Sequence, residues 1–208
     1  MTLLSKSRFA KAHGPTVGGP VLGPLWRVAY PSRFDRDALC CDIFIPSPQE
    51  PHTATRTRIV NVHLDSLPIN PSHRPRQFST VASFLPSAGH GLVAGDFNPV
   101  LDEDATLVES NGLTDVWTAL HPGKPGNTWG TDGEQAFPPS RLDKVVLLGL
   151  QPYHIEVLEP KRLGEVFMEQ HNDQASVDQS EFQKTQSSDV NLPLSDHQPL
   201  LCSFSLAG

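Results

Sequence analysis

Short strand-like segments, rather than long helices, dominate the apolar pattern of this chain. Along "TRIVNVHL" (57–64), side chains divide between two faces with a period of two, the spacing typical of a β-strand. The other apolar runs of strand length are 38–45, 90–95, 141–149 and 199–206. Strands of this length must pack their apolar faces on another layer to be stable, so the pattern predicts a sheet-based core.

Two segments favour helices instead. Residues 72–85 carry apolar side chains at helical spacing, with Ser72 able to cap the first turn and Pro75 early in the segment. The apolar positions are Phe78, Val81, Ala82 and Leu85. Residues 111–120 form a second, shorter candidate. We therefore predict an α+β protein.

One domain is the economical interpretation of a 208-residue chain. Residues 1–37, rich in Gly and Pro, predict an irregular N-terminal arm. Residues 38–208 predict a single folded domain, interrupted near 165–190 by a polar stretch that is typical of a long surface loop.

Composition excludes several classes of protein. No segment approaches the roughly 18 continuous apolar residues that a membrane-spanning helix needs. The first residues lack the apolar region of a secretory signal. Cys40, Cys41 and Cys202 form neither a disulfide framework nor a C-x-x-C metal spacing, which favours a reducing compartment. We therefore expect an intracellular protein of the cytoplasm or nucleus.

Net charge argues against broad capture of duplex nucleic acid. The chain carries a formal charge of −7 and no long basic run, whereas duplex binding relies on many Lys and Arg contacts. A local cationic patch stays open, because "TRTR" (55–58) and "HRPR" (73–76) flank one candidate site.

Polar clusters follow the predicted strands at four places. They are Asn61, His63 and Asp65 in "NVHLDS"; Asp96 and Asn98 in "GDFN"; Arg141 and Asp143 in "RLD"; and Ser195, Asp196 and His197 in "SDH". Each cluster alone has a structural explanation as a turn or a cap. Their succession is far more specific than any one of them.

That succession resembles the endonuclease/exonuclease/phosphatase family of metal-dependent phosphoesterases, over about residues 38 to 206. Within the family it is most similar to the branch containing tyrosyl-DNA phosphodiesterase and sphingomyelinase-like enzymes. The resemblance implies a four-layer αββα fold, a two-sheet β-sandwich flanked by helices. It also implies hydrolysis of phosphodiester or phosphomonoester bonds with Mg²⁺, or Mn²⁺ in its place. The substrate would be a nucleic-acid end, a phospholipid or a small phosphoester.

The resemblance assigns roles to the clusters. Asp96 would orient or deprotonate the attacking water, and Asn98 would donate to the phosphoryl group. An offset of two residues on extended chain would place both side chains on one face. His197, hydrogen-bonded by Asp143, would donate to the phosphate or act as an acid. The remaining assignments are His63 near the leaving group and Asp196 near a metal ion.

Two further residues are candidate substrate contacts. Trp129 in "NTWG" would offer a stacking surface along the substrate groove, or would be a core or rim aromatic residue. Arg74 would contact phosphate, or, like Arg76, would lie on the solvated face of the helix, which is the usual place for such residues.

The beginning of the chain departs from the family. The family opens with a strand carrying an Asn and a later strand ending in the Glu that is its main magnesium ligand, yet only 62 residues precede His63 here. Gln49 and Glu50 lie between prolines and favour an ordinary turn. We therefore expect an N-terminally incomplete fold with an exposed sheet edge.

Three explanations of that departure stay open. The chain is a truncated gene product, a catalytically impaired or inactive remnant, or an enzyme with an unidentified replacement for the Glu. Two other classes are less well supported. A serine hydrolase using Ser195 or Ser66 with His197 lacks a G-x-S-x-G elbow, and a zinc site from His63, His73 and His197 lacks ligand spacing.

Overall fold

The computed structural model describes residues 19–47, 53–133, 135–160 and 194–206. Its strands are β1 (Val21–Ala29), β2 (Asp37–Pro46), β3 (Ala54–His63), β4 (His90–Asp96), β5 (Thr114–Asp115), β6 (Asp143–Leu148), β7 (Leu150–Val157) and β8 (Leu200–Leu206). Its helices are α2 (Arg74–Ala82) and α3 (Val116–Leu120), with short 3₁₀ turns η1 (Pro86–Ala88), η2 (Asp102–Asp104) and η3 (Glu109–Asn111). Among the helices of these residues, none has the length and apolar character needed to cross a membrane.

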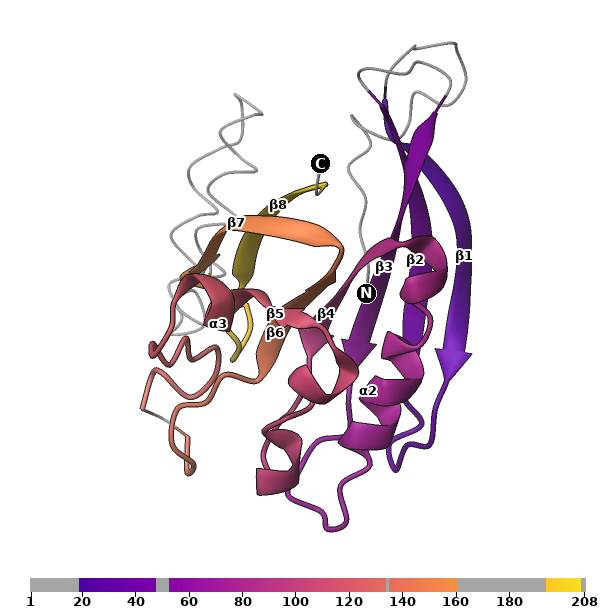
Figure 1. Ribbon diagram of the computed structural model, residues 1–208. Coiled ribbons are helices and arrows are strands. Elements are labelled where there is room, and N and C mark those ends of the chain that lie inside the picture. The colour runs from indigo at the N-terminus through magenta and orange to yellow at the C-terminus, as the bar shows by residue number, and fades with distance from the viewer. Residues whose placement is uncertain (1–18, 48–52, 134, 161–193, 207–208) are drawn as a thin grey trace, which may run out of the picture.

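The strands form two sheets, as the α+β prediction requires. The large sheet has the order β1-β2-β3-β4-β6-β5, and β7 and β8 pair antiparallel in a second sheet. Among the strands of the described residues, only β3 and β4 pair in parallel, and the connection between them contains α2. Figure 1 shows α2 against β2 and β3, with β7 and β8 over the β4 and β6 part of the sheet. The described fold is thus a layered β-sandwich with one face of its large sheet covered by helix.

Each face of the large sheet has its own core. Val60 and Val62 of β3 pack with Phe78 of α2 on one face, whereas Ile59 faces the second cluster, between the large sheet and β7–β8. The second cluster includes Leu92, Val145, Leu147, Leu150 and Ile155. The period of two seen in the sequence is therefore the division between the two cores.

Residues 21–29 correct the predicted irregular arm. They form β1, which pairs antiparallel with β2 at one edge of the large sheet. The strand was not predicted because Gly23 and Pro24 are residues that strands usually avoid. The register of the pairing shifts at these two residues, between Leu22 and Leu25. A bulge at an edge strand is where Gly and Pro are tolerated in a sheet.

The second sheet contains a strand that the sequence did not predict. Residues 150–157 form β7, although Pro152, His154 and Glu156 interrupt its apolar pattern. Within the described residues, β7 and β8 have no further strand partners, so this sheet has unpaired edges there. The predicted polar loop at 165–190 lies outside the described residues.

Candidate active site

Three strand ends meet at one edge of the large sheet. In the register of the strands, His63 at the end of β3 pairs with Asp96 at the end of β4, and Asp96 pairs with Asp143 at the start of β6. The sheet therefore aligns three of the predicted residues in one row, side by side.

His197 joins this row from the segment before β8. Its Nδ1 atom lies 2.7 Å from Oδ2 of Asp143. This hydrogen bond to Asp143 raises the pKa of His197 above its usual value, against the lowering effect of burial. The predicted pairing of Asp143 with His197 is present, and the geometry favours an imidazolium at this position.

His63 and Asp96 form a second pair of the same chemistry. Nε2 of His63 lies 3.3 Å from Oδ2 of Asp96, and the His63 side chain is 53% exposed. Burial lowers the pKa of His63 more than Asp96 raises it. For Asp96 itself, burial and then the charge of Asp143 raise the pKa. The carboxylate of Asp96 is accordingly more basic than an ordinary aspartate.

Asn98 lies beside Asp96, but not in the predicted way. Its φ of +45° turns the chain, so Asp96 and Asn98 do not project from one face of an extended strand. The Asn98 backbone N–H donates to Oδ1 of Asp96 at 2.9 Å. Its side-chain Nδ2 donates to the carbonyl of Leu64 at 3.2 Å and to Oγ of Ser66 at 3.4 Å. A tight turn, rather than strand alternation, brings the pair together.

Gly95 explains how β4 delivers Asp96 so close to β3. It has a φ of +135°, and a Cβ atom there would lie 2.0 Å from the Val62 carbonyl oxygen. Only glycine permits this approach, because any side chain would collide with the neighbouring backbone.

Thr128 is a site residue that the sequence did not reveal. Its side chain is fully buried, and its hydroxyl donates to Oδ2 of Asp143 at 2.8 Å. The Thr128 hydroxyl oxygen itself accepts the backbone N–H groups of Leu142 at 3.2 Å and Asp143 at 3.0 Å. The only signal in the sequence is its position next to Trp129.

Trp129 and Asp196 lie together at the rim of the site. The indole Nε1 donates to Oδ2 of Asp196 at 3.3 Å. The backbone of Trp129 forms bridges with both Ser140 and His197. Trp129 is therefore a half-buried residue that ties the His197 segment to the site, with its ring at the rim.

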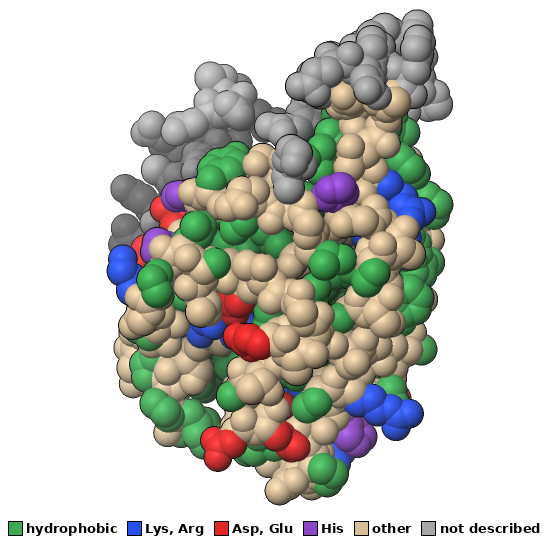
Figure 2. All heavy atoms as spheres, in the orientation of Figure 1, with side chains coloured by type: hydrophobic (Ala, Val, Ile, Leu, Met, Phe, Trp, Pro, Cys, Tyr) green, Lys and Arg blue, Asp and Glu red, His purple; other side chains and the backbone are tan. Residues whose placement is uncertain are grey.

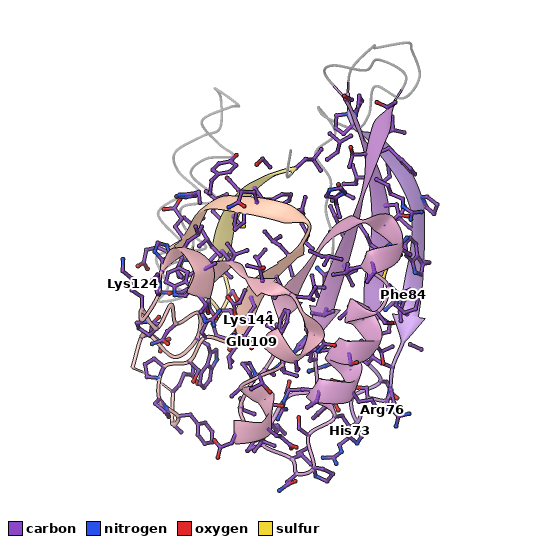
Figure 3. The ribbon with its side chains drawn as sticks, in the orientation of Figure 1. His73, Arg76, Phe84, Glu109, Lys124 and Lys144 are labelled. Carbon is purple, nitrogen blue, oxygen red and sulfur yellow. The ribbon has the colours of Figure 1, made fainter. Side chains whose placement is uncertain are left out.

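Arg74 is not in the site, which corrects both predictions made for it. Its side chain is 1% exposed, with Nε 2.7 Å from Oδ2 of Asp104. Its Nη1 donates to the carbonyls of Asp65 and Leu67. Arg74 thus neither contacts substrate nor faces solvent. Through these two carbonyls, Arg74 holds the loop that follows His63. Arg76, which lies further along α2, is labelled in Figure 3.

Arg141 and Lys144 belong to a separate ion cluster. Arg141 donates to both carboxylate oxygens of Asp115 at 2.8 Å, and Lys144 lies 3.2 Å from the same carboxylate. Lys144, labelled near Glu109 in Figure 3, neighbours Asp143 on β6 and so projects from the opposite face. Arg141 thereby holds Asp115, the residue that caps the start of α3.

The serine hydrolase alternative finds no support in the geometry. The Ser195 hydroxyl oxygen accepts the backbone N–H of His197 at 3.0 Å. The Ser66 hydroxyl oxygen accepts from Asn98. Neither bond is the serine–imidazole contact that activates a nucleophile.

The described residues contain no cluster of metal-ligating side chains. Within them, no group of three or more His, Cys, Asp and Glu side chains is arranged to hold a metal ion. Asp196, the predicted metal ligand, instead accepts the indole N–H of Trp129, and Glu50 lies outside the described residues.

Other surface features lie apart from this cluster. A groove of about 470 Å³ between α3 and β7 is lined by residues such as Trp117, His121, Tyr153 and Glu156, and includes none of the paired site residues. On the face shown in Figure 2, Lys and Arg side chains are separated by uncharged ones. That face has no continuous basic surface of the kind that duplex nucleic acid binding requires.

Comparison with known proteins identifies the fold. No family model and no curated protein match the sequence. Among solved structures, D. rerio TDP2 humanized by 14 mutations matches with a TM-score of 0.63 and 18% identity, over 89% of this chain and 68% of that chain. D. rerio TDP2 complexed with a single-strand DNA product gives 0.61 and 17% over the same shares.

Two further structures extend this likeness. An endonuclease/exonuclease/phosphatase family protein from Bacteroides thetaiotaomicron has a TM-score of 0.59 and 15% identity, over 92% of this chain and 66% of that one. The inositol polyphosphate 5-phosphatase domain of SPsynaptojanin, with inositol (1,4)-bisphosphate and calcium ion, has 0.53 and 14%, over 89% and 55%. At these identities the likeness is one of fold. The chain therefore has the endonuclease/exonuclease/phosphatase fold, and it spans part of the length of its structural neighbours.

Proposed function

We propose that this chain carries a phosphoester-hydrolysing site where β3, β4 and β6 meet. The observation that carries the proposal is the pair of carboxylate–imidazole contacts, Asp143–His197 and Asp96–His63, which the register of the sheet sets side by side. Solved structures of this fold include an inositol polyphosphate 5-phosphatase domain and D. rerio TDP2 in complex with a single-strand DNA product, which supports phosphoester hydrolysis as the general reaction class.

The two pairs suit the two proton transfers of ester hydrolysis. Asp96, with its raised pKa, accepts a proton from the attacking water and directs the lone pair of that water at phosphorus. His197, whose pKa is raised by its hydrogen bond to Asp143, donates a proton to a phosphoryl oxygen or to the leaving oxygen as the P–O bond breaks. His63 is partly exposed beside Asp96, and its role would be to contact the leaving group or the attacking water.

Asn98 supplies a further donor to the phosphoryl group. Its contact to Ser66 Oγ is 3.4 Å, longer than an ordinary hydrogen bond, whereas its contact to the Leu64 carbonyl is 3.2 Å. The weaker bond exchanges for a phosphoryl oxygen at small cost. The stronger one keeps the carboxamide in place.

The substrate class is a phosphodiester or phosphomonoester with an exposed phosphate. A nucleic-acid end, a phospholipid headgroup and a small phosphoester all present such a group. Trp129, at the rim beside His197, offers a surface on which a base or a sugar ring stacks. Dependence on Mg²⁺ or Mn²⁺ stays a prediction, because the described residues assemble no ligand set.

The test is hydrolysis of bis-p-nitrophenyl phosphate and p-nitrophenyl phosphate by the purified chain, with Mg²⁺, with Mn²⁺ and with EDTA. We expect turnover that is lost in His197→Ala and in Asp96→Asn. The matched control is His154→Ala, since His154 is an exposed histidine of β7 outside the site.

The outcomes separate the proposal from its alternative. Turnover that survives in His197→Ala would remove the role of that imidazole. A folded chain without turnover under any metal condition would favour an inactive remnant of the fold, which keeps the site geometry but not the reaction.

A further inference from the structure

We propose that Thr128 is a positioning residue that holds the Asp143 carboxylate against His197. Oδ2 of Asp143 accepts two hydrogen bonds, from the Thr128 hydroxyl at 2.8 Å and from the His197 ring at 2.7 Å. The Asp143 side chain is thereby fixed by a fully buried donor on a residue outside the two carboxylate–imidazole pairs.

The Thr128 hydroxyl is itself fixed in direction. Its oxygen accepts two backbone N–H groups, those of Leu142 and Asp143, so its single proton is left to point at the carboxylate. A buried hydroxyl with all of its bonding capacity used cannot rotate without breaking one of these bonds. The hydroxyl therefore determines which oxygen of Asp143 faces His197, and it fixes the position of that oxygen.

The backbone of Thr128 aligns the other partner. Its carbonyl accepts the Gln198 N–H at 2.7 Å, one residue beyond His197. Its own N–H donates to the Ser140 carbonyl at 3.0 Å. One buried residue thus holds the strand that carries Asp143 and the segment that carries His197 at a common spacing.

Substitution separates this role from general packing. Thr128→Val keeps the shape and removes the hydroxyl, whereas Thr128→Ser keeps the hydroxyl. The matched control is Thr57→Val, because Thr57 is also buried in the large sheet and its hydroxyl has no hydrogen-bond partner in the described part of the chain.

The first readout is the downfield proton NMR signal of His197 Nδ1–H, identified by its absence in His197→Ala. We expect this signal in the wild type, in Thr128→Ser and in Thr57→Val, and its loss in Asp143→Asn and Thr128→Val. The proposal is overturned if folded Thr128→Val keeps the wild-type signal. It is equally overturned if folded Thr128→Ser loses the signal, a test that stands even where the valine variant does not fold, or if the wild type shows no such proton.

The second readout rests on the proposed function. With bis-p-nitrophenyl phosphate, Thr128→Val should lower kcat by roughly 10- to 100-fold with KM unchanged, the effect of a misplaced catalytic group. Thr128→Ser, which keeps the hydroxyl, should retain most of the wild-type kcat. A chain without turnover would contradict the proposed function, while the NMR signal would still decide the role of Thr128.

Discussion

The two carboxylate–imidazole pairs of this chain contain the same two kinds of side chain, but the pKa values of their imidazoles are shifted in opposite directions. In the Asp143–His197 pair, a 2.7 Å hydrogen bond raises the pKa of the imidazole. In the Asp96–His63 pair, the contact is 3.3 Å and burial leaves the imidazole pKa below its usual value. The two carboxylates, Asp96 and Asp143, are paired on neighbouring strands of one sheet, so their position in the sheet alone does not set the pKa of the imidazole beside each.

The two carboxylates are also held differently. Asp143 is fixed by the buried Thr128 hydroxyl, and it presents the same oxygen to His197. For Asp96, the Asn98 backbone N–H donates to Oδ1, the oxygen that does not face His63. A carboxylate that is held toward its imidazole stabilises the imidazolium, whereas one beside another carboxylate becomes a base.

The largest expected effect is on turnover. His197→Ala should lower kcat by about 10²- to 10⁴-fold, the range for a lost general acid. His63→Ala should lower it by roughly tenfold, since His63 is neutral and half exposed. Steady-state hydrolysis of bis-p-nitrophenyl phosphate measures both. An equal or larger loss of kcat in His63→Ala would contradict the prediction that His197 contributes more to turnover than His63.

A smaller effect concerns the Asp96 carboxyl group. Because the charge of Asp143 is one cause of its raised pKa, Asp143→Asn should lower the pKa of Asp96 toward the ordinary aspartate value. Carbon-13 NMR of the side-chain carboxyl measures the titration, with Asp115→Asn as a control outside the site. No movement in Asp143→Asn would show that the two carboxylates do not interact.

The smallest expected effect is on the pH dependence of stability. The pKa of His197 is raised by folding, so its stabilising contribution is full below the unfolded value of about 6.5 and is lost as pH rises through the folded pKa. The pKa of His63 is lowered, so His63 destabilises the fold as pH falls below about 6.5.

Melting temperatures of His197→Gln and His63→Gln across pH check these signs. Lowering the pH should increase the advantage of the wild type over His197→Gln and decrease it over His63→Gln. Parallel slopes for the two variants would mean that both histidines respond to pH in the same direction, against the electrostatics described here.

The sequence predicted which strands carry the site residues because the alternation of side chains along a strand is a local property. The period of two in residues 57–64 placed Val60 and Ile59 on opposite faces, and polar residues at strand ends predicted where side chains meet. The pairing of Asp143 with His197, 54 residues apart, came from the family resemblance and is present in the structure.

Other features depend on partners that no local pattern contains. Arg74 is buried because Asp104, 30 residues later, neutralises it. Asn98 leaves the strand direction through a positive φ that its residue type tolerates but does not require. β7 was missed because its Pro, His and Glu residues hide a strand that buries only Leu150, Pro152 and Ile155.

The most direct test of the opposed pairs is an NMR titration of both imidazoles in the wild-type chain. It requires neither a known substrate nor a metal ion. The account predicts that His197 titrates above the usual histidine pKa of about 6.5 and His63 below it, with Asp143→Asn lowering the value for His197. A His63 pKa equal to or higher than that of His197 would contradict the assignment of His197 as the charged partner and of Asp96 as the base.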